Sequence, residues 1–126
     1  MDKDFILVGI VMLIFMGFAV FAFGGTNIKN ENNNSVNYDT FAQCLAEKGV
    51  IMYGAYWCGH CNNQKAMFGD SWQYVDYIEC STSTGQAQEC TDADITGYPT
   101  WEFSGQKVPG ELSFEDISRY SGCELD

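Results

Sequence analysis

Two cysteines separated by two residues, Cys58 and Cys61, have the types and spacing best suited to chemistry in this sequence. They directly follow an apolar run, residues 50–55, and they open a segment predicted to be helical. A thiol at the start of a helix lies near unpaired backbone N–H groups and the positive end of the helix dipole. Both stabilise a thiolate, which is the species that attacks or leaves in disulfide exchange. The arrangement therefore predicts a redox pair.

A zinc site is the alternative for such a pair, and it would need two more ligands at a matching spacing. Cys80 and Cys90 are separated by nine residues rather than two, and His60 lies between the two thiols of the motif. We therefore favour redox chemistry and predict neither a bound metal nor a cofactor.

The N-terminal part differs in composition from the rest of the 126 residues. Residues 5–24 form an uncharged apolar run of 20 residues, about the length that crosses a hydrocarbon core of ~30 Å. Cleaved signal peptides usually have apolar regions of roughly 7–15 residues. A small-residue pattern at residues 22–24 keeps cleavage open as an alternative. We expect an uncleaved, membrane-spanning signal-anchor after a short flank, residues 1–4.

The segment after this span, residues 25–38, contains six asparagines and almost no apolar side chains. It cannot bury enough surface to fold, so we predict a flexible linker. The remaining residues, 39–126, are sufficient for one small domain, a size that profits from disulfide crosslinks.

The cysteine count and the net charge indicate the compartment and the class of partner. Six cysteines in so short a chain are more typical of an oxidising compartment than of the cytosol. Lys3 and Lys29 lie on opposite sides of the apolar run, so the charges favour an orientation only weakly. We expect a single-pass protein of the cell membrane whose domain faces the extracytoplasmic side. The net charge of −11 argues against nucleic acid as a partner.

Turn residues and apolar periodicity predict the elements that position the cysteines. The first helix is expected to begin at Thr40, with Gln43 completing a capping box, and to end at Gly49. The expected elements after it are a strand over residues 50–55, the cysteine-bearing helix up to residue 69, a strand over 74–78, a short helix within 86–93, two strands at 100–103 and 107–108, and a final helix capped by Ser113 with Asp116.

This order, together with residues 57–61 (Trp-Cys-Gly-His-Cys) and 97–100 (Gly-Tyr-Pro-Thr), resembles the thioredoxin superfamily. The Cys-Gly-His-Cys version is that of protein disulfide isomerases. More narrowly, the sequence is similar to the thioredoxin-like domain associated with bacterial homologues of vitamin K epoxide reductase. The segments that carry this narrower resemblance are residues 52–58, 64–65, 68–69, 77–80 and 97–101.

The resemblance covers residues 41–123 and implies an α/β, thioredoxin-like fold with a central four-stranded mixed sheet flanked by helices. In fusions of that group, a four-helix membrane domain reduces quinone. One membrane-spanning segment cannot replace that domain. We therefore expect electrons to pass to a separate quinone-linked membrane protein that resembles vitamin K epoxide reductase.

The resemblance also assigns roles to the motif. Cys58 matches the exposed cysteine that is attacked by or attacks substrates, and Cys61 matches the buried resolving cysteine. His60 lies between them, and a protonated imidazole there favours the Cys58 thiolate and therefore the reduced form. Stabilising the dithiol makes the pair a better oxidant.

A second part of the site is implied around Pro99, which matches the proline that is cis in this fold. The backbone of the preceding residue, Tyr98 after Gly97, is expected to pair with extended substrate like an added strand. Tyr56 and Trp57, together with Tyr98, are expected to form an apolar rim for unfolded chains.

One departure from the family concerns proton transfer. Thioredoxins and disulfide isomerases carry a buried acid six positions before the first cysteine, where this sequence has Met52. Proton transfer to and from Cys61 must then use water or a group that the sequence does not identify.

The other four cysteines have different expected roles. The related domains imply a structural disulfide between Cys80 and Cys90, with a second redox relay as the alternative. A disulfide that closes this loop of about ten residues would contribute roughly 2–3 kcal/mol to the free energy of unfolding. Cys44 is predicted to be a buried free thiol on the apolar face of the first helix. Cys123 is either free or paired with Cys44.

The function expected from these observations is oxidation of thiols in cysteine-containing client proteins through a dithiol–disulfide cycle of Cys58 and Cys61. A disulfide reductase or isomerase that uses the same residues is the alternative. A non-enzymatic, tethered binding module is the third class, and replacement of Cys58 by serine would leave its binding intact.

Overall fold

A mixed four-stranded sheet forms the centre of the computed structural model, which describes residues 37–125. The expected signal-anchor, residues 5–24, lies outside the described residues. Within the described part, no helix has the length and apolar character needed to cross a bilayer.

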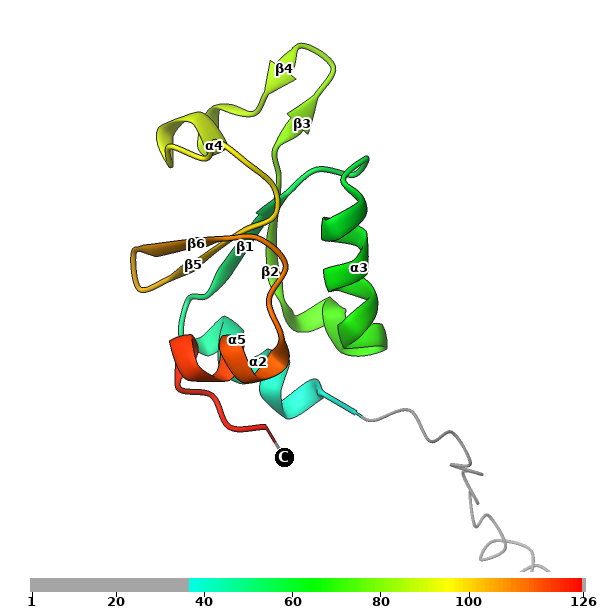
Figure 1. Cartoon of the computed structure of the whole chain (residues 1–126), viewed down its shortest axis with the longest axis vertical. Helices are drawn as coiled ribbons and strands as arrows, with labels where there is room; N and C mark the ends of the chain where they lie inside the picture. Colours follow the sequence, from blue (N-terminus) through cyan, green and yellow to red (C-terminus); the bar gives the residue numbers. More distant parts are fainter. Residues whose placement is uncertain (1–36, 126) are drawn as a thin grey trace, which may run out of the picture. The chain divides into compact units, whose positions relative to one another are not determined.

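The sheet has the strand order β2-β1-β5-β6 (Figure 1). β1 (Ile51–Gly54) runs parallel to β2 (Asp76–Glu79) and antiparallel to β5 (Thr100–Phe103). β6 (Gln106–Pro109) pairs with β5 in the predicted hairpin. The mixed sheet expected from the sequence is therefore confirmed.

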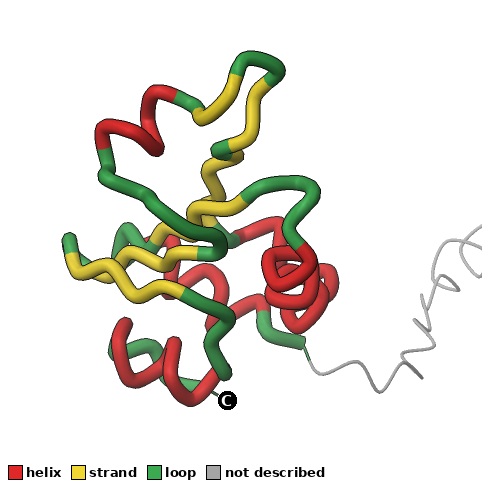
Figure 2. The backbone as a smooth tube through the Cα atoms, turned by 45° about the horizontal axis from the view of Figure 1, so that its top comes forward, coloured by secondary structure: helices red, strands yellow, loops and turns green. Residues whose placement is uncertain are grey.

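The α-helices follow one another along the chain in the order that the sequence predicts. Figure 2 shows them around the strands. Their bounds are Asp39–Glu47 for α2, Gly59–Phe68 for α3, Gln88–Asp92 for α4 and Phe114–Ser121 for α5, with a 3-10 helix η1 at Gly69–Tyr74. Ser113 caps α5 as predicted, because its side chain accepts a hydrogen bond from the Asp116 amide.

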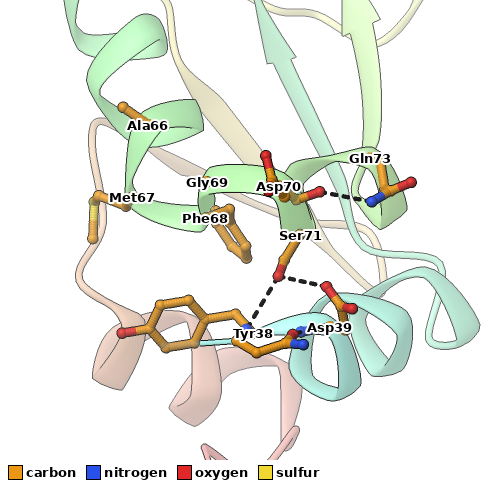
Figure 3. A pocket seen from close by; sticks show the side chains of 10 residues that line it. Tyr38, Asp39, Ala66, Met67, Phe68, Gly69, Asp70, Ser71 and Gln73 are labelled. Atoms are coloured by element: carbon orange, nitrogen blue, oxygen red, sulfur yellow. Dashed lines mark hydrogen bonds between the residues drawn. The ribbon is translucent and has the colours of Figure 1, made fainter. Parts of the chain in front are cut away.

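The start of α2 differs from the prediction. The helix begins at Asp39, one residue early, and its cap residue Tyr38 makes no side-chain capping bond, so the predicted capping box at Thr40 is wrong. Ser71 of η1 holds this end instead (Figure 3). Its hydroxyl accepts from the Tyr38 amide at 3.1 Å and donates to the Asp39 carboxylate at 2.6 Å. A residue 32 positions along the chain therefore replaces the local cap.

Two apolar clusters lie on opposite faces of β1, because successive side chains of a strand alternate between faces. Met52 belongs to the larger cluster, and Tyr53 belongs to the smaller one. The larger cluster, which we call the main core, also contains Leu45, Cys58, Cys61, Phe68, Trp101 and Ile117. The smaller cluster contains Tyr53, Cys80, Cys90 and Ile95.

A small hairpin was not predicted. β3 (Ser81–Thr82) and β4 (Gly85–Gln86) pair in a segment where no strand was expected. Strands of two residues are too short to produce an alternating pattern. The hairpin and α4 lie at the end of the sheet opposite α2 and α5 (Figure 1).

Candidate functional site: a disulfide at the start of α3

The Cys58–Cys61 disulfide spans the first turn of α3, with the two Cα atoms 5.2 Å apart. Cys58 is the N-cap residue, and its sulfur accepts a hydrogen bond from the Cys61 amide at 3.1 Å. The sulfur of a reduced Cys58 would therefore face an unpaired helix N–H and the positive end of the helix dipole. This position favours a thiolate at Cys58, as the sequence predicted on physical grounds.

The two sulfurs differ in access. Cys61 is 0 % exposed and Cys58 is 7 % exposed, beside the exposed side chains of Tyr56 and Trp57. An incoming thiolate therefore reaches Cys58 in preference to Cys61. The difference matches the attacking and resolving roles that the family resemblance assigns.

His60 points to solvent from the first turn of α3, and its side chain is 76 % exposed. Its Nδ1 lies 3.0 Å from a carboxylate oxygen of Glu111, which follows β6. This contact ties the imidazole to the segment that follows β6. Sequence reasoning missed Glu111, because 51 residues separate it from His60.

The Tyr98–Pro99 peptide bond is cis, and Tyr98 packs against the main core that contains both cysteines of the motif. The rings of Tyr98 and Trp57 meet edge to face, with centroids 5.9 Å apart. The carbonyl of Gly97 accepts a hydrogen bond from the Thr100 hydroxyl at 2.8 Å, which ties the exposed turn to β5. The structure thus joins Trp57 to the turn before Pro99, whereas Tyr56 stands 68 % exposed beside them.

The β3–β4 hairpin lies beside Trp57 and borders the predicted client-binding rim on one side. Trp57 Nε1 donates a hydrogen bond to the Ser81 hydroxyl at 2.9 Å. A hollow of about 200 Å³ lies between the indole and the hairpin, lined by Trp57, Cys80, Ser81, Thr82, Gly85, Gln86 and Tyr98. No sequence signal identified this side of the rim, because the hairpin itself was not predicted.

Gln64 is a buried polar residue that fixes the orientation of α3. Its side-chain oxygen accepts from the Leu112 amide at 2.7 Å and from the indole nitrogen of Trp101 at 3.2 Å. Its amide nitrogen donates to the Leu112 carbonyl at 3.0 Å. These bonds connect the helix that carries the motif to β5 and to the segment before α5. The signal in the sequence was a glutamine three residues after Cys61, on the same helix face.

Glu79, at the end of β2, holds the loop that precedes the motif. One carboxylate oxygen accepts from the amides of Tyr56 and Ser81, at 3.1 and 2.9 Å, and the other accepts from the Tyr77 hydroxyl at 2.8 Å. Burial opposes ionisation of Glu79, but these three hydrogen bonds and the positive charge of Lys65 lower its pKa overall. Glu79 is therefore a carboxylate at neutral pH.

The remaining cysteines form two more disulfides. Cys80 pairs with Cys90, with Cα atoms 5.7 Å apart and both side chains fully buried. Cys44 pairs with Cys123, which is one of the two alternatives that the sequence left open, and the free thiol expected by default at Cys44 is not found. The end of the chain returns to α2, where the Lys48 ammonium donates hydrogen bonds to the carbonyls of Ser121 and Gly122. This return places Cys123 beside Cys44.

A second hollow, of about 420 Å³, lies at the other end of α3 (Figure 3). Its lining includes Tyr38, Asp39, Met67 and Ser71, and none of the sequence-predicted site residues. Its polar groups are largely used in joining η1 to α2. Within the described residues, Cys58 and Cys61 thus lie at the opposite end of α3 from this hollow.

The sequence is similar to that of a curated plant protein whose name states its activity. It is 36% identical over 91 residues to the thiol-disulfide oxidoreductase LTO1 of Arabidopsis thaliana. The match covers 68% of this chain and 24% of that protein, so the chain spans about a quarter of the length of its relative. No family model matches the sequence. The similarity supports a relationship between this domain and the thioredoxin-like thiol-disulfide oxidoreductases.

Proposed function

We propose that this protein is a membrane-anchored thiol oxidase that forms disulfides in extracytoplasmic client proteins. The observation that carries the proposal is the Cys58–Cys61 disulfide, which is placed at a helix start where Cys58 is 7 % exposed and Cys61 is fully buried. The anchor rests on the apolar composition of residues 5–24. The oxidising compartment rests on the cysteine content, and all six cysteines pair within the domain.

The oxidation proceeds in two exchanges. A client thiolate attacks Cys58 Sγ, the Cys58–Cys61 bond breaks, and Cys61 leaves as a thiolate that takes up a proton. A second client thiolate then attacks the client sulfur of the mixed disulfide, and Cys58 leaves as a thiolate. The client gains a disulfide, and the two electrons remain on the Cys58–Cys61 dithiol.

Client binding is proposed to use the rim of Tyr56, Trp57 and Tyr98, with the exposed Gly97 turn beside it. The exposed aromatic faces suit apolar side chains, and a peptide backbone along the turn before Pro99 would add main-chain hydrogen bonds. Such binding tolerates many sequences, as an oxidase of unfolded chains requires.

A separate membrane protein that passes electrons to quinone is the proposed partner for reoxidation. This part of the proposal rests on the resemblance to domains associated with vitamin K epoxide reductase homologues. The LTO1 protein extends well beyond the matched segment, since this chain covers only 24% of it. The partner would accept electrons from Cys58 by the same exchange chemistry.

The test is the resting redox state of Cys58 and Cys61 in intact cells that produce the full chain. Acid quenching followed by a mass-tagging thiol reagent reports it, with Cys58→Ser and Cys61→Ser variants to assign the shift. We expect mostly the disulfide. A mostly dithiol form would contradict the oxidase and favour a reductase or isomerase.

Topology is tested separately with a C-terminal reporter that is active only outside the cytoplasm. Reporter activity supports the proposed orientation, and activity of a cytoplasm-specific reporter would contradict it. Retention of client binding by Cys58→Ser, with no exchange activity in the unaltered chain, would favour the non-enzymatic binding module.

A further inference from the structure

Cys61 must lose and regain a proton in every dithiol–disulfide cycle, and its surroundings make this difficult. The side chain is fully buried in the main core with Met52 and Ala55. A thiol among apolar side chains ionises readily only when a proton acceptor lies nearby. Met52 has no titratable group, so the acceptor is either water or a group on another element.

Gly54 marks the point where such a group approaches Cys61. A Cβ atom at Gly54 would lie 3.1 Å from Cys61 Sγ and 3.2 Å from Tyr77 Oη. Cys61 Sγ and Tyr77 Oη therefore lie close to one common point. The distance between these two atoms is at most about twice the distance from either atom to that point. That separation is within reach of direct contact after a small movement, or of one bridging water. Glycine at this strand position has no Cβ atom that would crowd the thiol and the phenol.

The Tyr77 hydroxyl is connected onward to a carboxylate. It donates to Glu79 Oε2 at 2.8 Å, and Glu79 is half-buried rather than fully enclosed. Lys65 of α3 is the other charged group that faces Tyr77, with Nζ 3.7 Å from the ring centroid. The neighbouring elements β1 and η1 contribute Gly54 and Trp72 there, and neither carries a titratable side chain.

The protonation states of this pair suit proton exchange. Burial, followed by the hydrogen bond and negative charge of Glu79, raises the pKa of Tyr77 far above its usual value. Tyr77 therefore remains a neutral hydroxyl. It can accept a proton only if it gives up its own hydroxyl proton at the same time. Glu79 is a carboxylate at neutral pH and can receive that proton.

We propose that the Tyr77 hydroxyl, hydrogen-bonded to Glu79, carries the proton to and from Cys61. The proposal rests on the Cys58–Cys61 cycle of the proposed function. During reoxidation the Cys61 proton moves to Tyr77 Oη while the Tyr77 hydroxyl proton moves to Glu79 Oε2, which releases it to solvent. The Cys61 thiolate then attacks Cys58 in the mixed disulfide, which forms the Cys58–Cys61 bond and releases the partner as a thiolate. During client oxidation the same proton path runs in reverse.

The experiment separates the two thiols in time. The purified full chain, reduced at Cys58 and Cys61, is mixed with one equivalent of an aromatic disulfide that releases a coloured thiolate. The first release reports attack by Cys58, and its rate depends on reagent concentration. The second release reports attack by Cys61 on the mixed disulfide, and its rate does not depend on that concentration.

Tyr77→Phe is expected to slow the second release at least about tenfold at neutral pH, because positioned acid–base groups usually contribute that much or more. The first release should stay within about twofold. The slowed step should become steeper with pH and should recover partly in concentrated imidazole buffer. Glu79→Gln, which keeps an oxygen for the Tyr56 and Ser81 amides, should slow the same step.

Tyr53→Phe is the matched control. The Tyr53 hydroxyl also donates to a carboxylate, that of Glu102 on the adjacent strand, at 3.0 Å. Tyr53, however, belongs to the smaller cluster on the opposite face of the sheet. Both releases should remain within about twofold. An unchanged second release in Tyr77→Phe, or equal slowing in Tyr53→Phe, would overturn the relay alone. Absence of the first release in the unaltered chain would overturn the proposed function and the relay with it.

Discussion

The Cys58–Cys61 and Cys80–Cys90 disulfides contain the same chemical group in opposite surroundings. The first lies in the opening turn of α3, faces a helix N–H through Cys58 and is partly accessible. The second has both sulfurs at 0 % exposure in the smaller cluster with Tyr53 and Ile95. We therefore expect the first disulfide to be exchangeable and the second to be structural, because their positions relative to a helix end and to solvent differ.

The comparison predicts a wide gap in reducibility, which is the largest expected effect. Disulfides with the motif of Cys58–Cys61 are half-reduced near roughly −180 mV, whereas structural disulfides lie below about −300 mV. This difference corresponds to about four orders of magnitude in the equilibrium constant. Alkylation and mass spectrometry across a series of glutathione or dithiothreitol buffers measure it. Reduction of Cys80–Cys90 in the same buffers as Cys58–Cys61 would remove the distinction.

The structural disulfides should differ from each other in their effect on stability. Cys44–Cys123 closes a loop of 79 positions and Cys80–Cys90 one of 10, for which loop entropy predicts about 4.5 and about 2.7 kcal/mol. Double alanine variants of each pair, compared by urea unfolding, measure both losses. The activity of Cys58 should persist in each variant at a temperature where the variant is folded. Loss of exchange in a folded variant without Cys80–Cys90 would instead support a second redox relay.

A methyl group at Gly54 should disturb the redox side of the sheet. Its Cβ would lie 2.9 Å from Tyr77 Cε2 and 3.1 Å from Cys61 Sγ, so Gly54→Ala is expected to cost about 1–3 kcal/mol of unfolding free energy. Gly59→Ala is the control, because nothing lies within 4 Å of a Cβ there. Chemical unfolding of both variants measures the difference, and equal stabilities would contradict the close approach.

The smallest expected effect concerns the two tyrosine–carboxylate pairs, Tyr77–Glu79 on the redox side and Tyr53–Glu102 on the other face. The pKa of Glu79 is lowered in the folded protein, so its ionised form stabilises the fold above its unfolded value near 4.5. That stabilisation is lost as the pH falls through the lowered folded value. The stability difference between the unaltered chain and Glu79→Gln should therefore shrink at acidic pH.

Urea unfolding at a series of pH values between neutrality and about pH 3 measures this change, across the usual range of carboxyl titration. Glu102→Gln, measured in parallel, reports the cost of losing a comparable pair on the opposite face. A stability difference for Glu79→Gln that stays constant over the whole range would contradict the lowered pKa.

Local patterns in the sequence were sufficient for the motif and for most of the elements. The capped start of α5 at Ser113 and the β5–β6 hairpin depend on neighbouring residues, and both are found where predicted. The predicted role of Cys58 follows from a thiol at a helix start, a few residues after a buried strand. Interactions between residues a few positions apart leave a readable pattern in the chain.

Contacts between distant parts of the chain had no such pattern. The sequence left Cys44 and Cys123 unresolved, and only the return of the chain end to α2 brings them together. It also named no group for proton transfer at Cys61, because Tyr77 comes from a strand whose parallel pairing with β1 places it beside Gly54. The sequence by itself determined the redox motif and the order of the elements. The tertiary structure decided which residues lie beside the motif, such as Glu111 and Tyr77, because they come from distant segments that only packing brings together.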